Sequence, residues 1–122
     1  MVSSYARQAT RDGATLLVTI ANDAWFGRSA ALRLHESLSM WRAIENRRFL
    51  VRATNTGLTS VIDPTGRRTM ELPIWTATAT RSPVHLPTFL SPYTRFGDIF
   101  AWTTTLLGIL LLWNRPRRRP SS

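Results

Sequence analysis

The chain has 122 residues and a mass of 13.8 kDa, which suits one small domain and is too short for a two-domain enzyme. Its formal charge is +9 and every one of its basic residues is arginine, so the sequence excludes mechanisms that need a lysine amine. Cysteine is also absent, which excludes disulfides, thiolate metal sites and a thiol nucleophile within these residues.

Two elements are predicted before the first aromatic loop. Residues 4–12 predict a short helix that ends at Gly13, because glycine commonly follows the last turn of a helix. Residues 16–20 (LLVTI) are a continuous apolar run, which is typical of a strand covered on both faces. A polar and aromatic loop, residues 22–27, follows this strand.

A longer helix is predicted over residues 29–47. Its apolar residues recur at helical spacing and form one stripe, which we expect to face the core: Leu34, Leu38, Trp41 and Ile44. The same periodicity predicts that Glu36, Arg42 and Glu45 mostly face water.

Three strands are predicted next. Residues 49–54 and 58–62 are β-rich runs joined by a short glycine-containing turn, and residues 67–72 follow a second turn at 63–66. We expect an antiparallel meander, to which residues 75–80 (WTATAT) add an edge strand. Two helices and a meander leave one face of a sheet only partly covered, so the α/β layered domain over residues 1–81 is expected to need a second half.

A membrane helix is predicted near the C-terminus. Residues 82–95, which contain three prolines, predict an extended linker. Residues 96–114 are almost free of charge, and nineteen helical residues span roughly 28 Å, close to the hydrocarbon thickness of a bilayer. The arginine-rich tail, residues 115–122, resembles a positive-inside signal, which predicts a cytoplasmic C-terminus and a domain on the opposite side. No signal peptide precedes such a domain, so we expect further chain upstream.

Chemistry carried by the residues alone is sparse. His35 and His85 are the side chains that titrate near neutrality, but no nucleophile elbow accompanies them and no histidine pair has metal-ligand spacing. Asp23 and Asp63 lie in turn-rich segments, where a turn or capping role is expected. The arginines are spread without interleaved aromatic residues, which argues against nucleic-acid binding.

Several motifs together resemble one family. These are LLVTIANDAWFG (residues 16–27), His35, RAIEN (42–46), RATNTG (52–57), VIDPTGR (61–67) and SPYTRFGD (91–98). The chain resembles the C-terminal part of the apolipoprotein N-acyltransferases, an inner-membrane branch of the bacterial nitrilase, or carbon-nitrogen hydrolase, superfamily. The resemblance covers residues 5 to 115.

The resemblance implies a fold and a reaction. The fold is a partial αββα sandwich on the periplasmic side, followed by one C-terminal transmembrane helix. The reaction transfers an acyl chain from a phospholipid to the N-terminal diacylglyceryl-cysteine of a lipoprotein, through a thioester on a catalytic Cys assisted by a Glu and a Lys, with no cofactor. By resemblance the Cys falls a few residues before Met1 and the Glu and Lys earlier still. We therefore expect no catalytic residue and no activity in this chain alone, with a missing N-terminal half as a candidate partner.

What the resemblance leaves in this chain is the rim of a site. We expect Asn22, Asp23, Trp25, Phe26 and His35 to contact phospholipid or apolipoprotein, with Trp25 and Phe26 lining a groove. Two structural alternatives stay open: the aromatic side chains pack the loop onto the domain, and His35 is a capping or supporting residue. The alternative function is a membrane-anchored, non-enzymatic domain or the remnant of a decayed gene.

Overall fold

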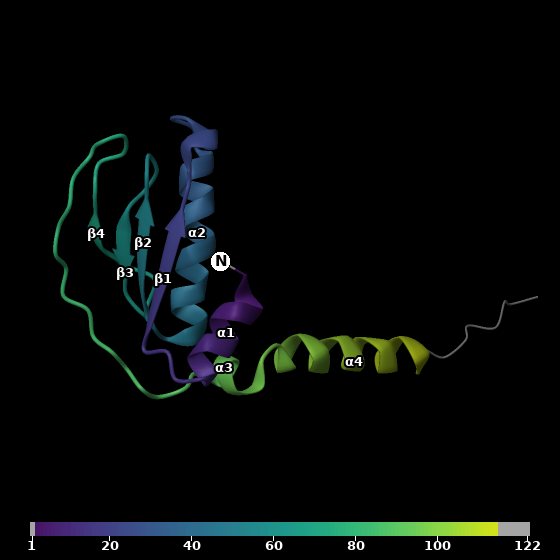
Figure 1. Ribbon diagram of the computed structural model, residues 1–122. Coiled ribbons are helices and arrows are strands. Elements are labelled where there is room, and N and C mark those ends of the chain that lie inside the picture. The colour runs from purple at the N-terminus through teal and green to yellow at the C-terminus, as the bar shows by residue number, and fades with distance from the viewer. Residues whose placement is uncertain (1, 115–122) are drawn as a thin grey trace, which may run out of the picture.

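A computed structural model describes residues 2–114 (Figure 1). It contains four helices, one short 3-10 turn and four strands. Their order is α1 (Ser3–Arg11), β1 (Leu16–Ala21), η1 (Ala24–Phe26), α2 (Ala31–Asn46), β2 (Phe49–Thr54), β3 (Ser60–Ile62), β4 (Arg68–Glu71), α3 (Pro92–Phe96) and α4 (Ile99–Trp113). The mixed α/β class and the elements predicted between residues 4 and 72 are confirmed.

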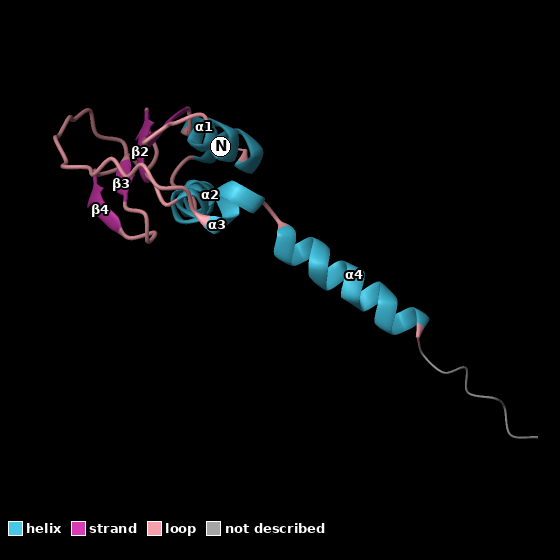
Figure 2. Ribbon diagram, turned by 90° about the horizontal axis from the view of Figure 1, so that it is seen from below, coloured by secondary structure: helices cyan, strands magenta, loops and turns pink. Residues whose placement is uncertain are grey.

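The four strands form one sheet in the order β1-β2-β3-β4. β1 and β2 are parallel and are connected by α2, whereas β2, β3 and β4 form the expected antiparallel meander. Both α1 and α2 cover the same face of the sheet (Figures 1 and 2). The core between them contains Ala6, Leu17, Ala43, Leu50 and Ile62. Because β1 and β2 are parallel, their carboxyl ends lie at one edge, which Figure 1 shows at the top of the domain.

The orientation predicted for α2 is wrong. Leu34, Leu38 and Trp41 are 68%, 50% and 52% exposed, so most of the apolar stripe faces outward. The buried side of α2 carries one leucine and otherwise small or polar residues: Leu32, Glu36, Ser39, Ala43 and Asn46. Periodicity of apolar residues could not reveal this, because the buried polar side chains have hydrogen-bond partners on distant strands and on α3.

The edge strand predicted at residues 75–80 is also absent from the described residues. A turn at residues 74–75, where the Trp75 N–H donates to the Thr56 carbonyl at 3.3 Å, is followed by an extended segment, residues 76–91, that pairs with no strand. This segment passes along the open side of the sheet and returns to α3 (Figure 1). Arg48, which is 1% exposed, holds its end by donating from Nη1 to the carbonyl of Phe89 at 2.8 Å. Burial lowers the pKa of the Arg48 guanidinium.

The predicted C-terminal transmembrane helix is contradicted. Among residues 2–114, no helix has both the length and the apolar character needed to cross a membrane. The apolar run breaks at Gly97, whose φ of 71° closes α3, so that α4 contains only the 15 residues from Ile99 to Trp113. At 1.5 Å per residue such a helix is about 22 Å long, short of the roughly 30 Å of a hydrocarbon core. The prediction for the tail, residues 115–122, lies outside the described residues.

Candidate functional site

The loop that carries the predicted site residues leaves the carboxyl end of β1. Asn22 Oδ1 accepts a hydrogen bond from the backbone N–H of Ala24 at 3.1 Å, which turns the chain into η1. Asn22 Oδ1 also accepts from Asn55 Nδ2 at 2.8 Å, so the loop is tied to the turn between β2 and β3. Residues from two separate connections therefore meet at this edge of the sheet.

Asp23 is the centre of this arrangement and is fully buried. Its Oδ1 lies 2.8 Å from His35 Nδ1, and its Oδ2 accepts from Arg52 Nη2 at 2.8 Å. Its backbone N–H donates to Asn55 Oδ1 at 3.1 Å. Gly57 lies so close that an added Cβ would stand 2.6 Å from the Cβ of Asp23. Both carboxylate oxygens thus have partners inside the protein.

Arg52 belongs to the same cluster, although the sequence did not single it out. It lies on β2, is fully buried, and donates from Nη1 to Ser39 Oγ of α2 at 3.0 Å. One feature of the sequence could have indicated its role. Arg52 lies within a largely apolar strand, and because successive side chains of a strand point to opposite faces, it shares the face of Leu50, toward α2. A buried guanidinium needs hydrogen-bond acceptors, and the Asp23 carboxylate is one that also carries the opposite charge.

His35 joins the loop to α2. Its Nδ1 lies 2.8 Å from Asp23 Oδ1 and 3.0 Å from Arg52 Nη2, so the imidazole contacts both members of the buried ion pair. The Phe26 ring packs on the imidazole, with ring centroids 5.4 Å apart and planes tilted by 58°. Phe26 is only 36% exposed, whereas Trp25 beside it is 84% exposed. The loop therefore holds one aromatic ring against the domain and presents the other to solvent.

A shallow cavity of about 440 Å³ lies next to this loop, where β1 and β2 end. Its lining consists of Ile20, Ala21, Asn22, Ala53, Thr54 and Asn55. Ile20 is 85% exposed. The two asparagine side chains are engaged with each other, so the surface left for a ligand is mainly apolar.

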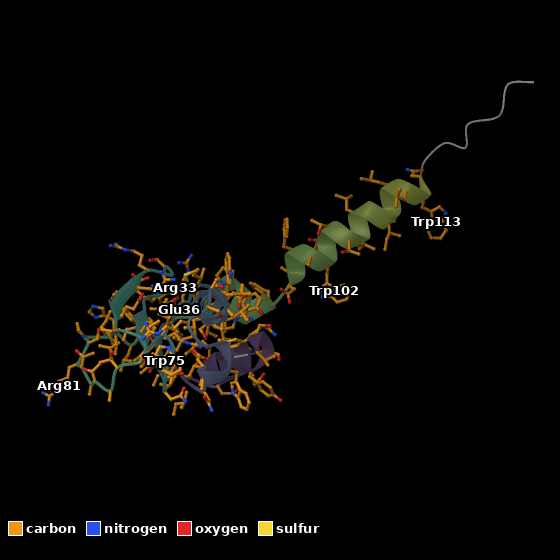
Figure 3. The ribbon with its side chains drawn as sticks, turned by 90° about the horizontal axis from the view of Figure 1, so that it is seen from above. Arg33, Glu36, Trp75, Arg81, Trp102 and Trp113 are labelled. Carbon is orange, nitrogen blue, oxygen red and sulfur yellow. The ribbon has the colours of Figure 1, made fainter. Side chains whose placement is uncertain are left out.

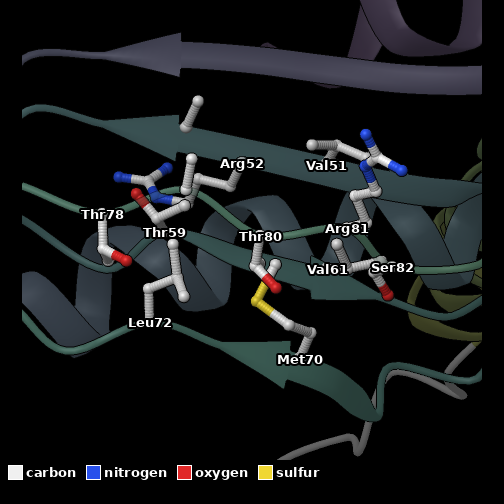
Figure 4. A pocket seen from close by; sticks show the side chains of 12 residues that line it. Val51, Arg52, Thr59, Val61, Met70, Leu72, Thr78, Thr80, Arg81 and Ser82 are labelled. Atoms are coloured by element: carbon white, nitrogen blue, oxygen red, sulfur yellow. The ribbon is translucent and has the colours of Figure 1, made fainter.

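A larger cavity of about 480 Å³ lies on the face of the sheet opposite α2 (Figure 4). Its floor includes Val51, Val61 and Met70, which are register partners on three adjacent strands. The extended segment, with Thr80 and Arg81, forms one wall. This cavity lies on the other face of the sheet from Asp23 and His35.

A second buried carboxylate, Glu36, follows His35 on α2 but belongs to a separate network. Its Oε1 accepts from Ser60 Oγ at 2.7 Å and its Oε2 from Arg68 Nε at 2.8 Å. Arg33, close to Glu36 in Figure 3, makes a paired contact with Glu71 on β4, both distances being 2.8 Å. This network fastens α2 to β3 and β4.

No metal site was found among residues 2–114, since no three His, Asp or Glu side chains there gather closely enough to bind an ion. The described residues of the edge likewise contain no thiol or amine nucleophile, because the sequence has neither Cys nor Lys. The site therefore consists of a positioned aromatic loop, a supporting polar cluster and an apolar cavity.

The class of protein follows from comparison with known families. The sequence model of the carbon-nitrogen hydrolase family matches residues 2–87, and the chain belongs to that family. Among curated proteins it is 47% identical over 97 residues to the apolipoprotein N-acyltransferase of Geobacter metallireducens, which covers 80% of this chain and 19% of that protein.

Two further relatives extend the match along the chain. The apolipoprotein N-acyltransferase of Bordetella bronchiseptica is 42% identical over 111 residues, 90% of this chain and 20% of the relative. That of Ralstonia nicotianae is 38% identical over 117 residues, 96% of this chain and 22% of the relative. The chain thus spans about one fifth of the length of the curated relatives it matches.

Proposed function

We propose that this chain is the C-terminal part of a bacterial apolipoprotein N-acyltransferase, which moves an acyl chain from a phospholipid to the N-terminal diacylglyceryl-cysteine of a lipoprotein. The observation that carries the proposal is the identity of 47% over 80% of the chain with a protein of that name. The motif NDAWFG (residues 22–27), in the loop after β1, is part of one of the motifs in which the chain resembles the apolipoprotein N-acyltransferases.

The rest of such an enzyme supplies the reacting groups. Thioester chemistry needs a thiol, and a sequence without Cys and Lys cannot provide the nucleophile or an amine that stabilises an oxyanion. We therefore propose that residues 2–114 contribute the substrate-facing rim and that the chain alone transfers no acyl group. The acting assembly works on the periplasmic face of the inner membrane, where lipid donor and lipoprotein meet.

The open face of the sheet supports the need for a second half. On β1, Val18 is 54% and Ile20 is 85% exposed, and both side chains lie on the face opposite α2. Their register partners on β2, Val51 and Ala53, continue the same apolar surface. A second sheet packed there would complete an αββα sandwich and remove these side chains from water, which is worth about 25 cal/mol per Å² of apolar area.

The domain boundaries belong to this proposal too. Residues 1–81 are the contribution to the sandwich, and residues 82–95 connect it to α4. At the end of this connection, Ser91 Oγ caps α3 by accepting a hydrogen bond from the N–H of Thr94 at 3.0 Å. Thr94 Oγ1 in turn donates to Asn46 Oδ1 at 3.0 Å, which anchors the connection to α2.

The test is an acyl-transfer assay with phospholipid vesicles as donor and a diacylglyceryl-cysteine lipopeptide as acceptor. Two preparations are compared: the 122-residue chain, and the protein extracted from its native membranes with an antibody to residues 58–72, whose intact mass is measured. We expect a species several-fold heavier than 13.8 kDa that transfers the acyl chain, and no transfer by the short chain. Transfer by the short chain, or none by the native protein, contradicts the proposal.

A further inference from the structure

The extended segment, residues 76–91, lies over part of the open face of the sheet (Figure 4). On β3, Ser60 donates to Glu36 of α2, so the next side chain, that of Val61, points to the opposite face. Val61 is nevertheless only 2% exposed, whereas Val18 on β1, which points to the same face, is 54% exposed. The extended segment therefore covers the β3 side of the open face and leaves the β1 side uncovered.

The segment lies over the sheet as a strand of a second layer does. The cavity of about 480 Å³ separates Val51, Val61 and Met70 on the sheet from residues 78–82 of the segment. Figures 1 and 4 show the segment running along the strands and not across them, which is the relation between the strands of two aligned sheets. A single segment, however, forms only part of such a layer.

The segment is fixed near its two ends. Trp75, just before it, has a φ of 59°, a left-handed conformation that side chains rarely adopt, and its N–H donates to the Thr56 carbonyl at 3.3 Å. This turn takes the chain from β4 to the open face. Near the far end, the Phe89 carbonyl accepts from the buried Arg48 at 2.8 Å. The path of the segment over the sheet is thus set by contacts outside its middle part.

The middle part has a backbone that is free to pair. Within residues 2–114, the N–H and C=O groups of residues 76–88 make no hydrogen bond. Residues 76–81 (TATATR) are exposed, contain no proline, and have threonine, which favours strands, at every second position. An extended, exposed and unpaired run of this kind is a template to which another strand can add through backbone hydrogen bonds.

The uncovered part of the face indicates where the added strand lies. Val18 and Ile20 of β1 are exposed beside the segment, and neighbouring strands of a sheet are about 4.8 Å apart. Strands added to residues 76–81 on this side would lie over β2 and β1 and cover both side chains. The chain spans about one fifth of its curated relatives, so the remainder of such a protein is long enough to supply these strands.

We propose that residues 76–81 are this chain's own strand of the second layer, and that an extended segment from the upstream part of the protein joins the domain by pairing its backbone with them. This inference rests on the proposed function, which supplies the upstream part. It adds the mode of assembly, because the two parts then share one hydrogen-bonded sheet.

Hydrogen exchange at single-residue resolution tests the pairing. The 122-residue chain is compared with the native-length protein extracted from membranes. In the 122-residue chain we expect the amides of residues 76–81 to exchange as fast as those of an unstructured peptide. In the native-length protein we expect every second amide to exchange on the order of a hundredfold more slowly, because alternate N–H groups of a strand paired along one edge face the partner.

Two neighbouring proline variants supply a matched control. Thr78→Pro and Ala79→Pro each remove one N–H, and neither N–H donates within the described residues, so both should leave the thermal midpoint of the 122-residue chain unchanged. In the native-length protein, the variant at the protected amide should abolish protection throughout residues 76–81. The other should be tolerated, because proline is compatible with a strand where the N–H faces away from the partner.

Three results overturn the pairing. Equally fast exchange of residues 76–81 in the two preparations means that no strand is added. Equal protection of every amide, or equal effects of the two proline variants, means that the segment is buried without pairing. Protection in the 122-residue chain that rises with its concentration means that the partner is a second copy of the chain.

Failure of the proposed function is distinguishable from these outcomes. A native-length protein that transfers the acyl chain but leaves residues 76–81 unprotected refutes the pairing alone. One that transfers no acyl chain but shows alternate protection refutes the proposed function and keeps the pairing. A native species of 13.8 kDa refutes both, because the upstream part is then absent.

Discussion

Asp23 and Arg52 form an ion pair, with Oδ2 and Nη2 2.8 Å apart, in which neither side chain is accessible to solvent. The pair joins the loop after β1 to the middle of β2, so it connects the edge of the sheet that carries Trp25 with the layer that packs on α2. Ser39 Oγ on α2 accepts a hydrogen bond from Nη1, a second nitrogen of the same guanidinium. The candidate site and the core of the domain are therefore physically continuous.

Removal of one partner of this pair is expected to be severe. Arg52→Met leaves the Asp23 carboxylate buried without its cation, and breaking a buried pair in this way costs about 3–5 kcal/mol. The free energy of unfolding, measured by urea titration of the 122-residue chain, tests this. The double variant Asp23→Asn, Arg52→Met is expected to lose less than the sum of the two single losses, because the two residues share one interaction. Strict additivity would show that the pair is not coupled.

A methyl group at Gly57 is expected to disturb the same carboxylate. The added Cβ would overlap Asp23, and overpacking of this kind typically costs about 1–3 kcal/mol. Gly108→Ala is the matched control, because a Cβ there meets nothing within 4 Å and alanine favours a helix over glycine. Thermal unfolding should shift downward for Gly57→Ala and stay unchanged or rise for Gly108→Ala. A Gly57→Ala chain as stable as the wild type would mean that the loop can move away at little cost.

How well the sequence predicts this structure depends on how far apart in the sequence the interacting residues lie. The strands at β1 and β2 and the helix between them follow from local runs and turns, and they were predicted within a few residues. The orientation of α2 was not, because Glu36 is buried only by virtue of Ser60 and Arg68, which lie 24 and 32 residues further along the chain. No local sequence pattern around Glu36 predicts hydrogen-bond partners at that separation.

The candidate site shows the same division. The motif around Asn22 to Gly27 drew attention to the loop, and His35 was among the predicted contacts. That Asp23, His35 and Arg52 meet is a product of the β1-α2-β2 connection, which brings residues 12 and 29 positions from Asp23 to its two oxygens. The length of α4 was misjudged for a different reason. Hydropathy counts Phe96 and Gly97 as part of one run, whereas the positive φ of Gly97 ends a separate helix.

Glu71 is expected to make the domain less stable in acid. The paired hydrogen bond from Arg33 lowers the pKa of Glu71 below its ordinary value, despite an opposing contribution from partial burial. A carboxyl group with a lowered folded-state pKa stabilises the fold above its unfolded pKa, and this contribution is lost as the pH falls through the folded pKa. Glu71→Gln should therefore be less stable than the wild type at pH 7 by about 0.2–1 kcal/mol, the range for partly exposed pairs. The difference should vanish in strongly acidic buffer. A constant difference at every pH would place its origin in packing.

Glu45 is expected to behave in the opposite way. Its pKa is raised above the ordinary value, chiefly by burial, which outweighs the favourable charge of Arg42, and Asp98 raises it further. Oε1 pairs with Arg42 at 3.0 Å, but the buried Oε2 has no hydrogen-bond partner within the described residues. A group with a raised folded-state pKa contributes stability below its unfolded pKa and loses it as the pH rises through the folded value, because the folded state then has to carry a poorly solvated anion.

Glu45→Gln removes that anion and is expected to raise the urea midpoint at pH 7. The corresponding gain in the free energy of unfolding is under about 1 kcal/mol, because the side chain is partly solvated. The gain should shrink as the pH is lowered past the ordinary range of a glutamate, where the wild-type side chain is itself neutral. Arg42→Met is the companion variant: it leaves Glu45 without its favourable charge and should lower the midpoint at pH 7 more than in acid. If Glu45→Gln instead destabilises the chain at pH 7, the ion pair with Arg42 outweighs the cost of burial, and the charged glutamate supports the contact between α2 and α3.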